Sequence, residues 1–362
     1  MLKIPAAELP KLRRRMLSWF AKRKRDLPWR RTLDPYRIWL SEIMLQQTRV
    51  ATVIPYYKRF LQSFPNVRAL ARAKTDRVLA NWAGLGYYSR ARNLQRAANE
   101  IVSRHGGDFP REYEAALALP GIGRYTAAAV LSIAYDEPHA VLDGNVARVL
   151  ARIGALRGDL RAPARWRKLE AAAQDLLDRN APGDWNQAMM ELGATVCMPQ
   201  SPQCWDCPVE KWCRARKLGI TEKVPSARKK RATVEITLAA AVLLDPRGRT
   251  LLVRQLDGDG ALFSHMWQFP AIESTGRDAR TALAGHLREK FGVAMKGRLT
   301  PLATARHAVT FRNIRLESYL VRVARLPDVW GARMVALGQI GSLPISSATL
   351  KIADAAIGYE IK

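Results

Sequence analysis

The sequence is short of acidic residues. Its 362 residues include 32 Asp and Glu against 59 Lys and Arg, which gives a formal net charge of +27. An excess of this size does not determine a fold, but it favours a polyanionic partner such as nucleic acid, with an anionic membrane surface as the alternative. Hydrophobic residues make up 48% of the chain, an ordinary globular fraction that excludes global disorder. The length predicts two domains.

Long apolar runs are also missing from the sequence. No stretch approaches the roughly 18 consecutive apolar residues of a membrane span. Basic residues interrupt every apolar patch of residues 1–29, where a signal peptide would need an unbroken apolar run. We therefore expect a cytoplasmic protein without a membrane partner.

Cysteine is scarce and confined to one segment. The spacing is Cys-x6-Cys-x2-Cys-x5-Cys, formed by Cys197, Cys204, Cys207 and Cys213. A disulfide scaffold would spread its cysteines along the chain, and a reducing cytoplasm disfavours disulfides. Four thiolates in one loop suit either structural zinc or an iron–sulfur cluster. The basic residues beside them could offset thiolate charge and contact phosphate; these are Lys211, Arg214 and Arg216.

The hydrophobic pattern changes once along the chain. Residues 1–222 repeat apolar residues every three or four positions, which predicts helices at 36–60, 69–82, 91–103, 125–134 and 166–177. Residues 223–232 are basic and contain a proline, as in an exposed linker. Beyond them we expect strands at 234–244, 250–254 and 310–321, and a helix at 278–291 ended by Gly292. An all-α domain at 1–222 would thus precede an α+β domain at 233–362.

Residues 119–126, Leu-Pro-Gly-Ile-Gly-Arg-Tyr-Thr, join two of the predicted helices. Gly121 and Gly123 allow a tight turn and a close approach to a partner, and the free N–H groups at the start of the second helix can hold a phosphate. An ordinary helix–helix turn could carry the same residues. In so basic a chain, with a four-cysteine loop, the turn predicts a helix-hairpin-helix that contacts the DNA backbone without base specificity.

Two acidic residues are candidates for catalysis. Asp143 stands at the expected start of a helix, where an N-cap role alone would explain it. The helix N-terminus would lower its pKa, and an ionised carboxylate could stabilise positive charge on a sugar. Glu42 is either an exposed helix residue or an acid in a pocket, where desolvation would raise its pKa. One neutral and one ionised carboxyl suit a proton donor and a charge stabiliser, but only the fold can unite them.

Five further features, taken with the cysteine loop, carry a resemblance to a known family. They are Leu27-Pro-Trp-Arg30 and residues 39–48 (WLSEIMLQQT), 84–93 (GLGYYSRARN), 142–150 (LDGNVARVL) and 186–193 (NQAMMELG). With them the chain closely resembles the MutY family of adenine DNA glycosylases, in the helix-hairpin-helix, endonuclease III superfamily. The resemblance runs through both domains. It implies removal of adenine mispaired with 8-oxoguanine or guanine in double-stranded DNA, by a monomer associated with the nucleoid.

The resemblance also implies roles for individual residues. Glu42 would protonate adenine, Asp143 would stabilise the oxocarbenium-like sugar, and Tyr125 and Asn145 would assist around that sugar. The base and duplex contacts would be Arg30 and Gln187, which line the adenine pocket, and Gln47 and Tyr87, which wedge into the duplex while adenine is flipped out. Core packing is the alternative for Tyr87, although the Gly84-Leu-Gly86 turn before it favours a loop tip. The cysteine loop would hold one 4Fe–4S cluster.

Tyr125 separates this chain from relatives that also cut the strand. Those enzymes have a lysine here, whose amine attacks the sugar. A phenol cannot form a Schiff base, so we expect a glycosylase with little or no lyase activity.

The sequence leaves three alternatives to this function. The first is a mismatch thymine glycosylase, which can also carry Tyr at this position but generally stops near the cysteine loop. The second is a non-catalytic lesion-binding protein, which would lack one carboxylate. The third is a ribosome- or membrane-associated basic protein, which would account for the charge alone.

Residues 233–362 resemble the MutT-like (Nudix) domain that reads 8-oxoguanine in this family. The helix expected to hold metal keeps one acid, Glu289, which is too few for magnesium and indicates recognition without hydrolysis. Family members often have Phe-Ser-His after an Arg-His pair in the lesion-reading loop, whereas here Arg306-His307 precedes Ala308-Val-Thr-Phe311. Thr310 could replace the serine hydroxyl. A literal Phe263-Ser264-His265 lies outside that context.

Overall fold

The computed structural model describes residue 2 and residues 4–226, 232–254, 266–274, 278–293, 299–309 and 311–360. Residues 227–231 of the expected linker, the 263–265 triplet and Thr310 lie outside this part of the chain. The density of internal contacts divides the chain into two compact units. One unit combines residues 1–72 with 92–229, and the other combines residues 73–91 with 230–362. Each unit is described by itself.

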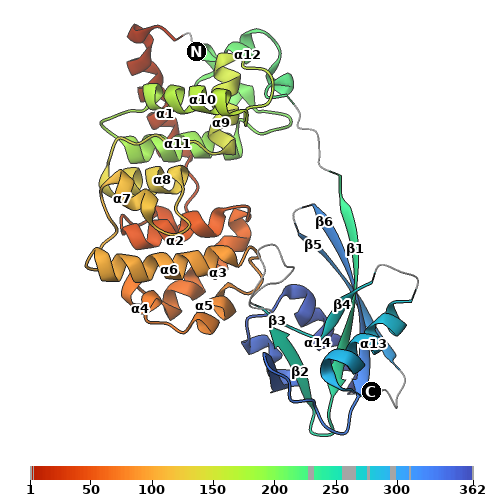
Figure 1. The fold of residues 1–362 in the computed structure, drawn as a ribbon. Coiled ribbons are helices and arrows are strands. Elements are labelled where there is room, and N and C mark those ends of the chain that lie inside the picture. Colours follow the sequence, from red (N-terminus) through yellow and green to blue (C-terminus); the bar gives the residue numbers. More distant parts are fainter. Residues whose placement is uncertain are drawn as a thin grey trace. The chain divides into compact units, whose positions relative to one another are not determined.

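The first unit is all-α (Figure 1). Helix α2 packs against α8 and α3, and α11 packs against α1, α8 and α9. α2 is buried along almost its whole length, from Tyr36 to Met44. Helix α5 (Thr75–Trp82) and the start of α6 belong to the second unit. The helices are α1 (Leu9–Arg23), α2 (Pro35–Leu45), α3 (Val50–Ser63), α4 (Val67–Ala71), α6 (Ser89–Arg104), α7 (Tyr113–Ala118), α8 (Arg124–Tyr135), α9 (Gly144–Gly154), α10 (Pro163–Leu176), α11 (Pro182–Thr195) and α12 (Arg214–Lys217).

Two of the expected helices are each broken in two. The segment 36–60 forms α2 and α3, separated by a turn in which Gln47 has a φ of +57°. The segment 69–82 spans the end of α4 and all of α5. The apolar spacing continues across a break when both helices bury the same side, so periodicity alone did not reveal it. The segments 91–103, 125–134 and 166–177 correspond to α6, α8 and α10.

The second unit contains a mixed sheet in the order β3-β2-β1-β6-β5, with β4 added to β1 and β7 added to β2. β1 runs parallel to β6, and the other named pairs are antiparallel. The strands are β1 (Val234–Leu244), β2 (Arg249–Arg254), β3 (Trp267–Gln268), β4 (Ala271–Glu273), β5 (Thr300–Val309), β6 (Arg312–Arg322) and β7 (Ala332–Ala336).

Helices α13 (Ala279–Phe291) and α14 (Ser347–Glu360) cover opposite faces of this sheet (Figure 1). Alternate residues of β1 enter the two cores: Leu243 packs in the cluster that contains α13, and Leu244 in the cluster that contains α14. The α+β prediction is confirmed, and the expected strand at 310–321 is β6, which begins at Arg312. In the described part of the chain, no helix combines the length and apolar character needed to cross a membrane.

Candidate active site

A cavity of about 550 Å³ in the first unit brings the candidate catalytic residues together. Its walls come from α2 and the turn after it, α8, the head of α9 and α11. Seven of the residues predicted for the site line it: Arg30, Glu42, Gln47, Tyr125, Asp143, Asn145 and Gln187. The fold therefore unites Glu42 with Asp143, which the sequence alone could not show.

Glu42 lies on α2 and is 5% exposed. Burial raises the pKa of its carboxyl to about 7, although the hydrogen bond from Tyr125 acts in the opposite direction. Tyr125 Oη donates to Glu42 Oε2 over 2.6 Å. Because this oxygen accepts a hydrogen bond, Oε1 is the better place for the proton of the neutral acid. Burial also raises the pKa of Tyr125 well above its ordinary value, so its phenol stays protonated.

Asp143 is the N-cap of α9. Its Oδ1 accepts from the Val146 N–H over 2.7 Å, and its Oδ2 accepts from Asn145 Nδ2 over 3.2 Å. The expected lowering of its pKa is wrong in sign: burial raises the pKa, and it outweighs the stabilising N–H groups of Val146 and Asn145. Those donors nevertheless oppose protonation of the Asp143 carboxylate, whereas Glu42 has no comparable set of N–H donors.

Asn145 is itself held in place. Arg148 Nη2 donates to Asn145 Oδ1 over 2.9 Å and to the Gly193 carbonyl over 2.8 Å. This bond leaves the amide nitrogen of Asn145 directed to Asp143. A Cβ on Gly193 would lie 2.7 Å from the Cβ of Asn145, so glycine allows α11 to approach α9 closely.

Glu191 is a site residue that the sequence analysis missed. It lies on α11, is 1% exposed, and lines the same cavity. Burial alone would raise its pKa, but hydrogen bonds from Arg25 and Arg30 lower the pKa to about 2. Arg25 Nη2 and Arg30 Nη2 each donate to Glu191 Oε2, over 2.7 and 2.9 Å. An acid inside the apolar 186–193 motif was the available signal, as it was for Glu42.

The two residues predicted to wedge into the duplex share an unusual backbone. Gln47 and Tyr87 both have left-handed conformations, with φ of +57° and +48°. Such strain in non-glycine residues clusters at functional sites. Tyr87 is 39% exposed, which contradicts the core-packing alternative, and its loop is shaped by Gly84 and Gly86 at φ of +99° and +70°. Tyr87 does not line the cavity among the residues described there.

The predicted hairpin lies between α7 and α8. Gly121 has a φ of +77°, and a Cβ there would lie 2.6 Å from the Cβ of Asn93. Gly123 is the N-cap of α8 and has open space where a Cβ would stand. The turn therefore presents the first N–H groups of α8, as the phosphate-binding expectation requires.

The four cysteines converge on one small cavity beside Arg152. Arg152 is 2% exposed and donates to the Met198 and Pro199 carbonyls, which orders the start of the loop. Within the described residues, no three His, Cys, Asp or Glu side chains are spaced to hold a single metal ion. Four thiols around one cavity are the donor set that a 4Fe–4S cluster requires, and four thiolates can also hold one zinc ion.

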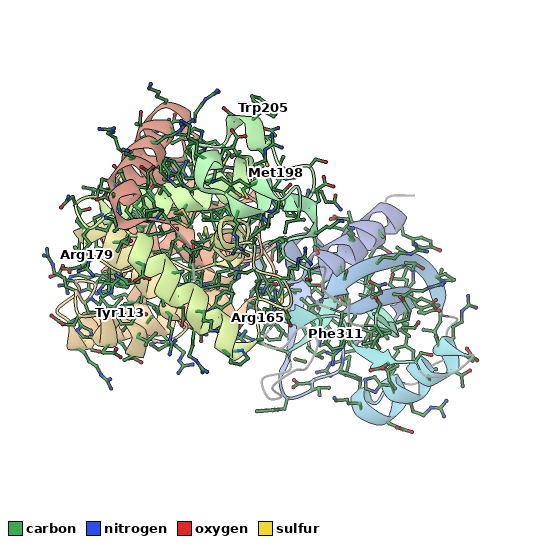
Figure 2. The ribbon with its side chains drawn as sticks, turned by 90° about the horizontal axis from the view of Figure 1, so that it is seen from above. Tyr113, Arg165, Arg179, Met198, Trp205 and Phe311 are labelled. Atoms are coloured by element: carbon green, nitrogen blue, oxygen red, sulfur yellow. The ribbon has the colours of Figure 1, made fainter. Side chains whose placement is uncertain are left out.

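The cysteine loop also presents aromatic surface. Trp205, between Cys204 and Cys207, is 77% exposed and projects from the edge of its unit (Figure 2). The turns around it are η3 (Cys204–Asp206) and η4 (Glu210–Trp212).

The expected lesion-reading loop is the tip of the β5–β6 hairpin, where Val309 pairs with Arg312. Arg306 and His307 lie on β5, and Thr310 falls outside the described residues. Phe311, labelled in Figure 2, is 36% exposed by its solvent-accessible area, and the Arg312 guanidinium lies over its ring. The tip thus offers an aromatic and a cation.

A family model and several curated proteins match this chain. Residues 40–178 match the HhH-GPD superfamily base excision DNA repair protein. The human adenine DNA glycosylase is 50% identical over 220 residues, which cover 58% of this chain and 40% of that protein. The mouse adenine DNA glycosylase is 34% identical over 401 residues, covering 96% of this chain and 78% of that protein. The chain belongs to the adenine DNA glycosylase family.

Solved structures of the wider superfamily share the fold of the first unit. A thermostable thymine-DNA glycosylase is 28% identical, with a TM-score of 0.53 over 59% of this chain and 98% of that one. Endonuclease III in a non-covalent DNA complex is 22% identical, with a TM-score of 0.51 over 60% of this chain. The predicted family and helix-hairpin-helix fold are confirmed. The matches to the human and rat adenine DNA glycosylases span less than half of those proteins' length.

Proposed function

We propose that this member of the adenine DNA glycosylase family hydrolyses the N-glycosidic bond of adenine mispaired with 8-oxoguanine or guanine in duplex DNA. One observation carries the proposal: Glu42 and Asp143 line the same cavity and differ in their hydrogen-bond partners. The names of the relatives support adenine as the base.

The reaction begins with a flipped adenine, because a stacked base hides its glycosidic bond. Neutral Glu42 gives its proton to a ring nitrogen of adenine, and the bonding pair between C1′ and the base leaves with adenine. Asp143 stabilises the positive charge left on the sugar. Water then adds its oxygen to C1′ and returns a proton to the site. The products are free adenine and an abasic site.

Neighbouring side chains orient these two acids and the base. Tyr125 fixes one oxygen of Glu42, and Asn145 donates to Asp143. Arg30 is held by Glu191 at the cavity wall, and Gln187 lines the same cavity, so both can contact adenine. Gln47 and Tyr87 fill the space that the flipped base leaves.

The reaction stops at the abasic site. A lyase needs an amine that attacks the sugar and forms a Schiff base. Position 125 is tyrosine, and no lysine is found among the described residues that line the cavity. We propose a monofunctional glycosylase.

We assign the remaining regions accordingly. Residues 1–222 form the glycosylase domain, 223–232 a basic linker, and 233–362 a Nudix-like domain that reads the opposite base. Cys197, Cys204, Cys207 and Cys213 hold one 4Fe–4S cluster that staples the loop. Gly121 and Gly123 place the hairpin on the DNA backbone, and Thr310 contacts the lesion. The protein acts as a monomer on nucleoid DNA.

The test uses an end-labelled duplex with a central adenine opposite 8-oxoguanine. Breaks at the adenine only after alkali support the proposal. Breaks without alkali would show lyase activity and contradict the assignment of Tyr125. If neither condition gives breaks, a thymine–guanine duplex tests the thymine glycosylase alternative, which the solved structure at 28% identity favours. Binding without any cleavage would indicate a non-catalytic sensor.

A further inference from the structure

The segment between α8 and α9 carries Asp143 into the cavity. Residues 136–143 form neither helix nor strand, so their backbone groups need partners from elsewhere. Gln174 on α10 supplies two of them. Its Nε2 donates to the Pro138 carbonyl over 2.8 Å, and its Oε1 accepts from the Ala140 N–H over 3.1 Å.

Asn186 on α11 holds the same segment through the next two groups. Its Nδ2 donates to the His139 carbonyl over 2.7 Å, and its Oδ1 accepts from the Val141 N–H over 3.1 Å. The same Nδ2 donates to Ser132 Oγ on α8 over 2.8 Å. Asn186 is 1% exposed, and its bonds to Val141 and Ser132 are sheltered from water.

The two amides divide the segment between them. In extended backbone, successive residues direct their N–H and C=O groups to opposite sides. Gln174 takes the groups of residues 138 and 140, and Asn186 takes those of residues 139 and 141. Each side chain therefore replaces a neighbouring strand. The His139 ring also stacks on Tyr113 of α7, with 4.7 Å between the ring centroids (Figure 2 labels Tyr113).

We infer that Gln174 and Asn186 form an amide clamp that positions Asp143 in the active site. The last clamped residue, Val141, stands two positions before Asp143, so the clamp sets where α9 begins. Neither amide lines the cavity, so both act through the backbone and are positioning residues. The catalytic part of this inference rests on the proposed function.

The energetic reason is the steep dependence of rate on position. A misplacement of about 1 Å in a catalytic constellation can cost about a hundredfold in rate. Removing Asn186 would leave the buried Val141 N–H and the His139 carbonyl without this partner, and the segment would shift to find water or other groups. The carboxylate would move with it.

The test compares Gln174→Met and Asn186→Leu, which keep similar side-chain size without the hydrogen bonds. We expect single-turnover adenine release to fall about ten- to a hundredfold, while the Kd for the mispaired duplex stays within about twofold. Leu169→Ala, on α10 and fully buried, is the control, because it destabilises the same helix without touching the clamp's hydrogen bonds. It should lower Tm and keep the rate. If Asn186→Leu does not fold, Gln174→Met, whose side chain is only half-buried, still decides the question.

Hydrogen exchange gives a second readout that does not depend on activity. The Val141 amide should exchange faster in Asn186→Leu, and the Ala140 amide faster in Gln174→Met. Adenine release at the wild-type rate in both variants would overturn the inference. A loss of release that is matched by an equal loss of duplex binding would also overturn it, and so would unchanged exchange of the two amides. A wild-type protein that releases no adenine would instead contradict the proposed function, and the exchange measurement would then decide the clamp.

Discussion

At the scale of single residues, the cavity contains three acids in three environments. Glu42 is buried with one phenol donor, Asp143 is half-buried at a helix N-terminus, and Glu191 is paired with two arginines. The pKa of Glu42 rises to about 7 and that of Glu191 falls to about 2. Loss of solvent raises the pKa of all three, so the number and charge of the donors decide which acid holds a proton near neutral pH.

Replacement of Asp143 by asparagine tests the charge stabiliser. Asp143→Asn keeps the N-cap oxygen for Val146 but removes the negative charge. We expect base release to fall by at least about a hundredfold, while the mispaired duplex binds with nearly wild-type affinity. Single-turnover rates and binding isotherms measure the two effects. Turnover at the wild-type rate would rule out the assignment.

Glu42→Gln tests the burial of the acid through stability. The folded pKa of about 7 lies above the ordinary value of 4.5, so the folded state binds the proton more tightly. Stability therefore falls as pH rises from about 4.5 to about 7 and stays lower above that range. Glutamine avoids this loss. The variant should be about 1–3 kcal/mol more stable than wild type at pH 8 in urea unfolding, with no such gain near pH 4.5.

At the scale of elements, short connections place the chemistry and the helices support it. The turn after α2 carries Gln47, the α7–α8 turn carries Gly121, and the α8–α9 segment carries Asp143. Each connection has its own restraint. Gln47 takes a left-handed conformation, Gly121 lies close to the side chain of Asn93, and two side-chain amides hold the α8–α9 segment. Loops positioned by a rigid scaffold commonly hold functional residues.

The two hairpin glycines make a matched pair for mutation. Gly121→Ala must adopt a φ of +77° and place a Cβ 2.6 Å from that of Asn93. It should destabilise the protein by about 2–3 kcal/mol and weaken binding to undamaged duplex. Gly123→Ala has an ordinary φ and open space, and should cost less than about 1 kcal/mol. Urea unfolding compares them, and equal losses would show that crowding at Asn93 is not the cause.

At the scale of the whole molecule, the formal net charge of +27 is the dominant property. A field of this size attracts polyanions such as DNA regardless of their sequence. Under the proposed function, selection of adenine falls instead to the cavity, where Glu42 and Glu191 are shielded from solvent and screening by salt is weaker.

Salt should therefore separate scanning from chemistry. Between about 50 and about 200 mM salt, affinity for undamaged duplex should fall roughly a thousandfold, as for proteins with several phosphate contacts. The single-turnover rate at saturating protein should change little. Fluorescence anisotropy and rate measurements at matched salt test both parts. A rate that falls in parallel with affinity would mean that surface charge also acts on the bound complex.

The sequence alone was sufficient for the family, the two fold classes and seven of the residues that line the cavity. Period-three and period-two patterns reflect one-sided burial, and chemical motifs are local, so both can be read along the chain. Glu191 was missed, although it lies inside a motif already identified.

Only the tertiary structure decided which acids meet, which one keeps its proton, and how Asp143 is held. Burial and long-range hydrogen bonds determine a pKa, and neither can be read from spacing; for this reason the predicted lowering of the Asp143 pKa was wrong. The partners that fix the α8–α9 segment come from Gln174 and Asn186, more than thirty positions further along the chain. Their pairing exists only once α10 and α11 have packed beside it.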